Sequence, residues 1–216
     1  MSARFGMNYR FLPRNGYGIM ENERLHQVLR WIDEANSADP NFDHSDGKKA
    51  MPKELLYGLR MTAWLERLRP EASDILRIAA RGQHLRRWEV PRDSYPATRE
   101  GYLQWRSFLY GFHGERVGEL MERAGYEQEA VERAKILIGK RGIKRDPEVQ
   151  MIEDIACLVF LEHYFPHFAD TQDAGKLPGI VRKTWNKMSE EGRSYALTLD
   201  FPEPIKALLV SVLEAT

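Results

Sequence analysis

The chain has 216 residues, and its 32 Lys and Arg residues balance its 32 Asp and Glu residues, so the formal net charge is zero. A neutral chain gives no overall electrostatic reason to bind nucleic acid or an anionic membrane, so any such reason has to be local. Its 43% hydrophobic and 30% charged residues predict a soluble, folded protein. Cys157 is the single cysteine, which excludes an intrachain disulfide and a cysteine-rich zinc site and favours a cytoplasmic location.

Residues 1–20 are predicted to form a flexible arm outside the folded domain. They contain arginines and no acidic residue, but they lack the apolar core of a signal peptide. Their glycines, proline and scattered aromatic residues also disfavour the amphipathic helix of a transit peptide. Met20 is an alternative candidate for the start of translation. No apolar run approaches the length of a membrane span, so we expect no membrane partner.

Apolar spacing predicts a series of helices along the chain. Leu25, Val28 and Ile32 fall on one face of a helix over 21–36, and a polar loop follows it. Pro52 suits the first turn of the next helix. This and the later helices are predicted over 53–70, 71–88, 99–125, 128–142, 146–165, 175–199 and 202–215, and the one over 99–125 is either unbroken or divided near Gly111.

The remaining patterns exclude other fold classes. No segment has the alternation of a half-buried strand, and there is no internal repeat and no low-complexity tract. The sequence therefore predicts one all-α domain, a single multi-helix bundle over residues 21–216.

Several runs of this chain carry a resemblance to a known family. They are ELLYGLRMTAWL, AARGQHLRRWEVPRDSYP, REGYLQWRSFLYGFH, EDIACLVFLEHYF and RKTWNKMS. Over roughly residues 23–200 the chain resembles an uncharacterised family, domain of unknown function 4202. That family has no assigned activity, so this resemblance implies a family and no function.

The order of elements also resembles the HD superfamily, all-helical metal phosphohydrolases named for a His-Asp doublet. The resemblance places Tyr57 at the first ligand position, Gln83 and His84 at the doublet, and Asp154 at the final position. His113, in the run FHGERV, resembles an additional histidine of that superfamily. Tyr57 and Gln83 depart from the pattern, because neither is a usual metal ligand.

Under this resemblance, His84, His113 and Asp154 are the candidate metal ligands. Two imidazoles and a carboxylate are a set that Zn, Fe or Mn accepts with open positions. Such a centre activates water and polarises a phosphoryl oxygen, with Glu153 as the candidate base. The same ligands also suit a mononuclear iron oxygenase.

Each of these residues has a structural alternative. His84 suits the C-terminal end of a helix, where an imidazolium meets exposed carbonyls. His113 suits a satisfied core histidine. Asp154 lies in the apolar run MIEDIACLVFL and needs a partner, which an arginine supplies as well as a metal does. Glu153 lies about 100° around the helix from Asp154 and is then expected to face solvent.

Arginines and aromatic residues are interleaved between residues 81 and 106, where acidic residues are few. A guanidinium grips phosphate or carboxylate with two hydrogen bonds, and an aromatic ring offers a face to a base or another ring. The same composition also suits single-stranded RNA, or a loop pinned by arginine pairs and aromatic packing. The candidate ligand-binding residues are Arg87, Trp88, Arg92, Tyr95, Arg99, Trp105, Arg106 and, from a later helix, Lys183.

Taken together, these patterns predict an HD-like domain that binds a phosphorylated or nucleotide-like small molecule and hydrolyses it with one divalent metal. The alternative is a non-catalytic helical module that binds an anionic ligand, RNA or a protein partner through the arginine-rich segment. Tyr57 and Gln83 favour the alternative. The patterns do not set the oligomeric state.

Overall fold

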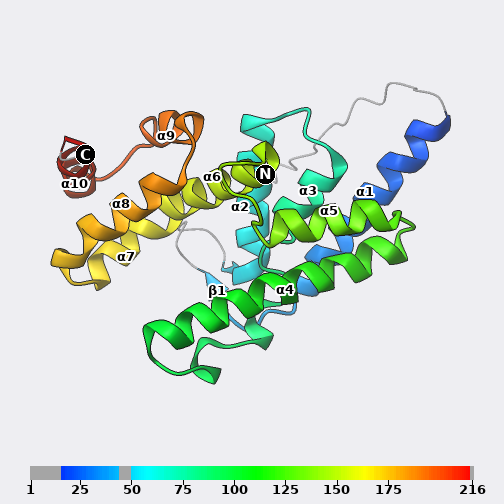
Figure 1. Cartoon of the computed structure of the whole chain (residues 1–216), viewed down its shortest axis with the longest axis horizontal. Helices are drawn as coiled ribbons and strands as arrows, with labels where there is room; N and C mark the ends of the chain where they lie inside the picture. The colour runs from blue at the N-terminus through cyan, green and yellow to red at the C-terminus, as the bar shows by residue number, and fades with distance from the viewer. Residues whose placement is uncertain (1–15, 44–49, 215–216) are drawn as a thin grey trace, which may run out of the picture.

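The structure, a computed structural model, describes the backbone of residues 16–43 and 50–214, and the side chains of 23–43, 50–203 and 205–212. In these residues the chain forms ten α-helices, a few short 3-10 and π-helical turns and a two-stranded sheet, as Figure 1 shows. The predicted all-α fold class is confirmed.

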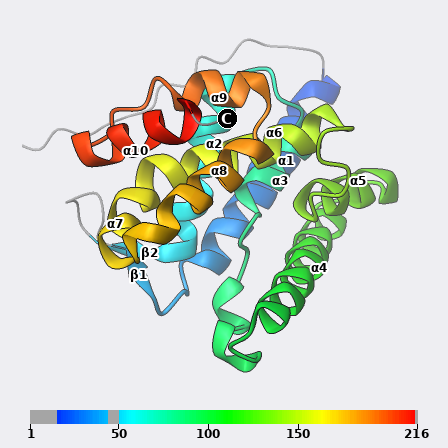
Figure 2. The ribbon, with the colours of Figure 1, turned by 60° about the vertical axis from the view of Figure 1, so that its left-hand side comes forward.

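The first half of the chain forms five of the helices and the small sheet. They are α1 (Gly16–Asn36), β1 (Phe42–Asp43), β2 (Met51–Pro52), α2 (Lys53–Leu68), α3 (Asp74–Arg81), α4 (Arg99–Arg123) and α5 (Gln128–Ile138). Short 3-10 turns, η1 (Arg87–Glu89) and η2 (Arg92–Ser94), connect α3 to α4. Helices α4 and α5 lie side by side along one flank of the molecule (Figure 2).

The second half of the chain adds five further helices. They are α6 (Pro147–Val159), α7 (Phe165–Thr171), α8 (Leu177–Lys187), α9 (Glu190–Ala196) and α10 (Glu203–Glu214), with a π-helical turn η3 (Phe160–Tyr164) after α6 and a 3-10 turn η4 (Ala174–Lys176) before α8. None of the helices in the described part of the chain is long and apolar enough to cross a membrane.

The structure differs from the predicted elements in several places, and the single helix predicted over 175–199 is the two helices α8 and α9. Helix α1 begins at Gly16, so the predicted boundary between arm and domain falls inside a helix, and residues 1–15 of the predicted arm lie outside the described residues. The predicted polar loop after α1 contains the two-residue strands, with Phe42 opposite Pro52. The predicted helix over 71–88 ends early, at Arg81.

The early end of α3 has a packing reason. Gly82 caps the helix, and a Cβ atom at this position would lie only 2.5 Å from Cγ2 of Val117 on α4. Only glycine allows this close approach, and the chain then turns away through residues 82–86. This turn carries His84 out of the helix and into contact with other elements.

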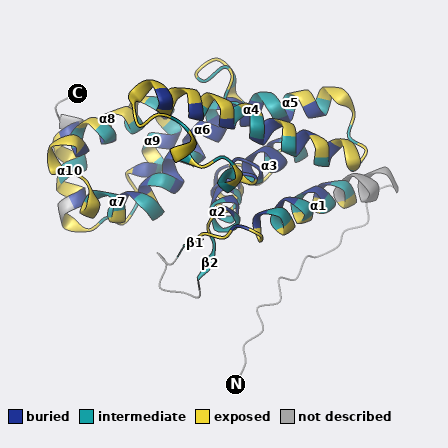
Figure 3. Cartoon of the chain, turned by 90° about the horizontal axis from the view of Figure 1, so that it is seen from below, coloured by how far each residue is buried: buried dark blue, intermediate teal, exposed yellow. Residues whose placement is uncertain are grey.

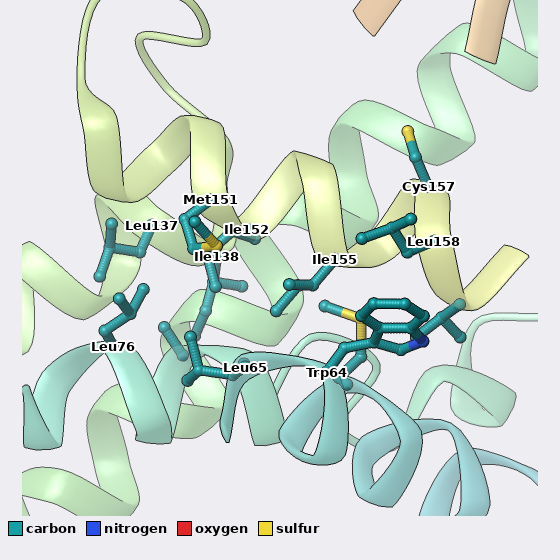
Figure 4. Close-up of a cluster of buried hydrophobic side chains, with 14 of the residues drawn as sticks. Trp64, Leu65, Leu76, Leu137, Ile138, Met151, Ile152, Ile155, Cys157 and Leu158 are labelled. Atoms are coloured by element: carbon teal, nitrogen blue, oxygen red, sulfur yellow. The ribbon is translucent and has the colours of Figure 1, made fainter. Parts of the chain in front are cut away.

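The core is centred on α6, which contacts α2, α3, α5, α8 and α9 (Figure 1). Ile152, Ile155 and Leu158 are fully buried and pack near Trp64 and Leu65 of α2, as Figure 4 shows. Figure 3 shows the same pattern for the whole molecule, with buried residues on the inner faces of the helices and exposed residues outside. Burying one such aliphatic side chain contributes about 1.5–3 kcal/mol.

Helix α6 has a second face. Figure 4 shows Cys157 on the opposite side of the helix from Ile155 and Trp64. Glu153 shares this face with Ala156 and Cys157, which lie three and four residues after it. This second face forms one wall of a pocket.

Candidate functional site

A cavity of about 240 Å³ lies where α2, α4, α6, the turn after α3 and the ends of α5 and α8 meet. Helix α4 contributes a stripe of side chains that recurs every three or four residues: Tyr102, Trp105, Arg106, Leu109, Tyr110 and His113. The facing wall is Glu153, Ala156 and Cys157 of α6, followed by Phe160. The rest of the lining is Tyr57 of α2, Gln83, His84 and Arg87 after α3, Lys140 after α5, and Lys187 at the end of α8.

Cationic groups outnumber acidic groups in the lining. Arg87, Arg106, Lys140 and Lys187 face a single carboxylate, that of Glu153. The Glu153 side chain is almost fully buried, and its two oxygens accept hydrogen bonds from Nζ of Lys140 at 2.6 Å and Nζ of Lys187 at 3.3 Å. The pocket therefore keeps a net positive charge after this internal pairing.

Glu153 was predicted as a base for water activation. Burial alone would raise the pKa of its carboxyl, but the ammonium groups of Lys140 and Lys187 outweigh burial and lower that pKa below its ordinary value. A carboxylate with a lowered pKa is a weak base at neutral pH. The geometry therefore favours a role for Glu153 in positioning the two lysines.

His84 is a neutral imidazole with a defined tautomer. Nη1 of Arg87 lies 3.2 Å from its Nε2, and because a guanidinium can only donate, Nε2 is the acceptor. Nδ1 therefore carries the proton and donates to Oε2 of Glu54 at 2.9 Å. Burial, with Arg87 and Lys140 nearby, lowers the pKa of His84 well below its usual value. The Tyr57 ring stacks on the imidazole, with centroids 3.8 Å apart.

His113 has one satisfied ring nitrogen and one unsatisfied ring nitrogen. Nδ1 donates to the backbone oxygen of Leu85 at 3.0 Å, so Nε2 carries the lone pair. That Nε2 is buried and has no hydrogen-bond partner among the described residues. Burial, reinforced by His84, lowers the pKa of His113 to about 3. The two imidazole rings lie close together, with centroids 5.8 Å apart.

Asp154 does not join the two histidines. Its Oδ1 accepts from the backbone N–H of Ser189 at 2.8 Å and from the Gln150 side chain at 2.9 Å, and its Oδ2 accepts from the Ser189 hydroxyl at 2.5 Å. A Cβ atom on Gly192 would lie 2.8 Å from Cγ of Asp154, so α9 packs directly on this carboxyl. The predicted convergence of the three candidate metal ligands is therefore not found.

The described residues contain no group of three or more His, Cys, Asp and Glu side chains placed to hold a metal ion. His84 and His113 supply two nitrogen donors of the predicted centre, and a third ligand is missing from that set. The residues therefore do not fit the predicted three-ligand centre.

The arginine-rich segment divides into two parts. Arg87 and Arg106 line the pocket together with Trp105, and the Arg87 guanidinium lies over the Trp105 ring at 4.6 Å. Arg92 instead donates to the backbone oxygens of Tyr95, Pro96 and Thr98, which pins the loop before α4. The candidates that do not line the pocket are Trp88, Arg92, Tyr95, Arg99 and Lys183.

Sequence reasoning missed Lys140 and chose the wrong lysine of a pair on α8. Lys183 and Lys187 lie one helical turn apart and share a helix face, and Lys187 rather than the candidate Lys183 lines the pocket. Lys140 has a left-handed backbone with φ of 51°, directly after the end of α5. Its position is set by how α5 packs on α6, which no local pattern reports.

Comparison with known proteins places the chain in a family. The family model "Domain of unknown function (DUF4202)" matches residues 26–209. The chain therefore belongs to this family. Searches of the curated proteins and of the solved structures found no match. The family description names no activity, so the function has to be inferred from the pocket.

Proposed function

We propose that this protein binds a phosphorylated small molecule in the pocket between α4 and α6. The observation that carries the proposal is the set of four cationic side chains around one carboxylate in a partly enclosed cavity. A phosphate monoester carries a charge of about −1.5 to −2 at neutral pH, which offsets this excess. Guanidinium and ammonium groups are the usual protein partners of phosphate oxygens.

The cations differ in how many donors they keep for a ligand. Among the described residues, Arg106 uses only Nε in a hydrogen bond, to the Tyr110 hydroxyl at 2.7 Å, which leaves its outer N–H groups for an anion. Both lysines are bound to Glu153, but the Lys187 side chain is 43% exposed and the Lys140 side chain only 9%. We therefore assign the first contact with the phosphate to Arg106 and Lys187.

The size of the pocket favours a compact ligand over RNA. About 240 Å³ falls below the ~300–1,000 Å³ of pockets for drug-sized ligands. Single-stranded nucleic acid needs an open groove with several aromatic platforms. Here Trp105 donates its indole N–H to the Val90 backbone oxygen at 2.9 Å and Arg92 is held by carbonyls, so part of the candidate surface has a structural role.

Titration calorimetry of the purified protein with inorganic phosphate and a panel of phosphorylated metabolites tests the proposal. We expect Lys187→Met to weaken binding of the best ligand at least tenfold, in line with loss of one charged hydrogen bond of about 1.5–3 kcal/mol. Lys183→Met is the matched control, because Lys183 is exposed on the same helix and does not line the pocket. Equal losses in both variants, or no binding by any anion, would contradict the proposal.

A second candidate is the predicted metal-dependent hydrolase of the HD type. It is favoured by the anchoring of both histidines, since metal-binding histidines usually donate the second N–H to a carboxylate or a backbone carbonyl. Here His84 donates to Glu54 and His113 to Leu85. No step of the primary proposal uses a metal, because the third predicted ligand is held by Ser189.

Elemental analysis of chelator-washed, untagged protein separates the two candidates. About one metal per chain, lost in His84→Ala and in His113→Ala but kept in the control His26→Ala, would establish a metal site on the two imidazoles. Iron with oxygen consumption would favour the oxygenase alternative, and zinc or manganese with phosphate release would favour the hydrolase. Absence of metal from the wild-type protein would leave anion binding as the function to pursue.

A further inference from the structure

His113 lines the pocket and carries a buried acceptor that a doubly ionised phosphate cannot satisfy. Nε2 of His113 is a buried lone pair without a partner among the described residues, and the side chain is 2% exposed. Leaving a buried acceptor unpaired costs about 1–3 kcal/mol. The oxygens of a doubly ionised phosphomonoester only accept, so they cannot offer a hydrogen to this nitrogen. A ligand that fits the pocket therefore needs a donor group as well as a phosphate.

We infer that the ligand is a hydroxyl-bearing phosphomonoester of sugar-phosphate size, with one hydroxyl donating to Nε2 of His113. This inference rests on the proposed function and names the class of ligand for the same pocket. The phosphate lies with Arg106 and Lys187, and the hydroxylated part extends toward the two histidines.

The positive charge of the pocket favours a ligand whose hydrogen-bond donor is uncharged. An ammonium group would also donate to His113, but it would have to enter a pocket with four cations and one carboxylate. His113 stays neutral at physiological pH because its pKa is lowered to about 3, so it stays an acceptor. A hydroxyl satisfies the lone pair without adding positive charge.

The other polar groups near His113 are already committed. Nε2 of His84 accepts from Arg87, and both Glu153 oxygens accept from lysines. The Glu153 oxygens have further lone pairs, so they can accept from additional hydroxyls of the same ligand. A ligand with several hydroxyls matches this arrangement better than one with a single donor.

The walls and the volume also match a sugar phosphate. Tyr102 and Trp105 of α4 and Phe160 after α6 are aromatic residues of the lining, and the Arg87 guanidinium lies over the Trp105 ring. Pockets of this type combine aromatic walls with a few placed polar groups. A cavity of about 240 Å³ suits a compact ligand without an attached base. The deep position of His113 Nε2 assigns the hydroxyl to the end of the ligand remote from the phosphate.

Five probes in titration calorimetry test the inference: ribose 5-phosphate, pentyl phosphate, inorganic phosphate, ribose and adenosine 5′-monophosphate. For the wild-type protein we expect ribose 5-phosphate to bind at least tenfold tighter than pentyl phosphate, a difference of about 1.4 kcal/mol. His113→Phe keeps the ring volume and removes the acceptor, so the two ligands should then bind within about twofold of each other. Inorganic phosphate should bind both proteins equally.

The outcomes separate this inference from the proposed function. Equal binding of ribose 5-phosphate and pentyl phosphate to the wild-type protein would overturn the inference and leave phosphate binding standing. No binding by any phosphorylated probe would overturn both. Tighter binding of adenosine 5′-monophosphate than of ribose 5-phosphate would show that a base is part of the ligand and would overturn the assigned size.

A second measurement covers the case in which His113→Phe does not fold. In wild-type protein with ¹⁵N-labelled histidine, the His113 Nε2 resonance reports directly on a hydrogen bond to its lone pair. Ribose 5-phosphate should shift this resonance, and pentyl phosphate should leave it unchanged. An unshifted resonance in the presence of bound ribose 5-phosphate would contradict the inference.

Discussion

At the scale of single residues, His84 and His113 show how partners fix the chemistry of a side chain. Each ring donates from Nδ1, to Glu54 and to the Leu85 carbonyl respectively, and each therefore presents an unprotonated Nε2. The sequence predicted that these two histidines matter but left open a helix cap for one and a satisfied core position for the other. In the structure His84 is a neutral ring between Glu54 and Arg87. His113 has a hydrogen-bond partner at Nδ1 but none at Nε2 among the described residues.

The lowered pKa values of the two histidines predict a loss of stability in mild acid. The unfolded chain takes up protons near the ordinary histidine pKa of about 6.5, while both folded rings stay neutral, so the free energy of unfolding falls as the pH falls below that value. Each ring contributes a slope of about 1.4 kcal/mol per pH unit once the pH is well below 6.5. Denaturant unfolding at pH 7, 6 and 5 measures the slope.

His113→Phe isolates one ring in this experiment. Its slope between pH 6 and 5 should be shallower than the wild-type slope by about 1 kcal/mol per pH unit. Glu54 has the opposite effect on the free energy of unfolding, because burial raises its pKa and the folded protein therefore binds its proton more tightly than the unfolded chain. Glu54 is present in both proteins, so its effect is common to the two slopes. Identical slopes would show that His113 is not a buried neutral ring.

At the scale of elements, α6 carries two adjacent carboxylates that bind different parts of the fold. Glu153 faces the pocket, where it holds the lysines at the ends of α5 and α8. Asp154, about 100° further around the helix, holds Ser189, and Ser189 caps α9 by accepting from the Gly192 N–H at 3.0 Å. The sequence identified both carboxylates as candidates, with Asp154 as a metal ligand and Glu153 as the base that activates water.

Asp154→Ala is predicted to destabilise the fold and to leave the phosphate affinity of the pocket nearly unchanged. The change removes three hydrogen bonds and leaves the Ser189 donors at a buried position unpaired, so we expect a loss of about 3 kcal/mol in the free energy of unfolding. Phosphate affinity of the folded variant should stay within about twofold, since Asp154 does not line the pocket. Denaturant unfolding and calorimetry measure the two quantities.

Asp170→Ala on α7 is the matched control for Asp154→Ala, because Asp170 is an exposed acid in a neighbouring helix. It should change the free energy of unfolding by less than about 0.5 kcal/mol. A stable Asp154→Ala protein that loses phosphate binding would place Asp154 in the site and would contradict the structural role assigned here.

At the scale of the whole molecule, local patterns predicted the helices better than the site. The apolar repeat of α6 and its N-cap at Asp146 are readable in the sequence, and the structure has that cap. The end of α3 depends on the approach of Gly82 to Val117, a contact 35 positions away in the chain that no window of sequence contains. The pocket depends in the same way on how α2, α4, α6 and α8 pack, so the sequence could not reveal Lys140 or show that Lys187, rather than Lys183, faces the pocket.

The two halves of the chain meet at the pocket, and this predicts how a ligand stabilises the molecule. Arg106 belongs to α4 and Lys187 to the end of α8, so a phosphate bound to both connects a helix from each half of the chain. At a ligand concentration of 100 times Kd, binding should stabilise the fold by about 2.7 kcal/mol. For a chain of this size that corresponds to a rise in Tm of about 5–10 °C.

Hydrogen exchange shows where that stabilisation acts. With bound ribose 5-phosphate, amide protection should increase in α4 around residues 102–113 and in α8 around residues 183–187 together, because one ligand holds both. Helix α10 contributes no side chain to the pocket, so it serves as the internal control and should gain the least. Lys187→Met should keep the added protection in α4 and lose it in α8, since Arg106 still binds the phosphate. Protection confined to α4 in the wild-type protein would mean that the ligand does not reach α8, and would remove Lys187 from the binding site.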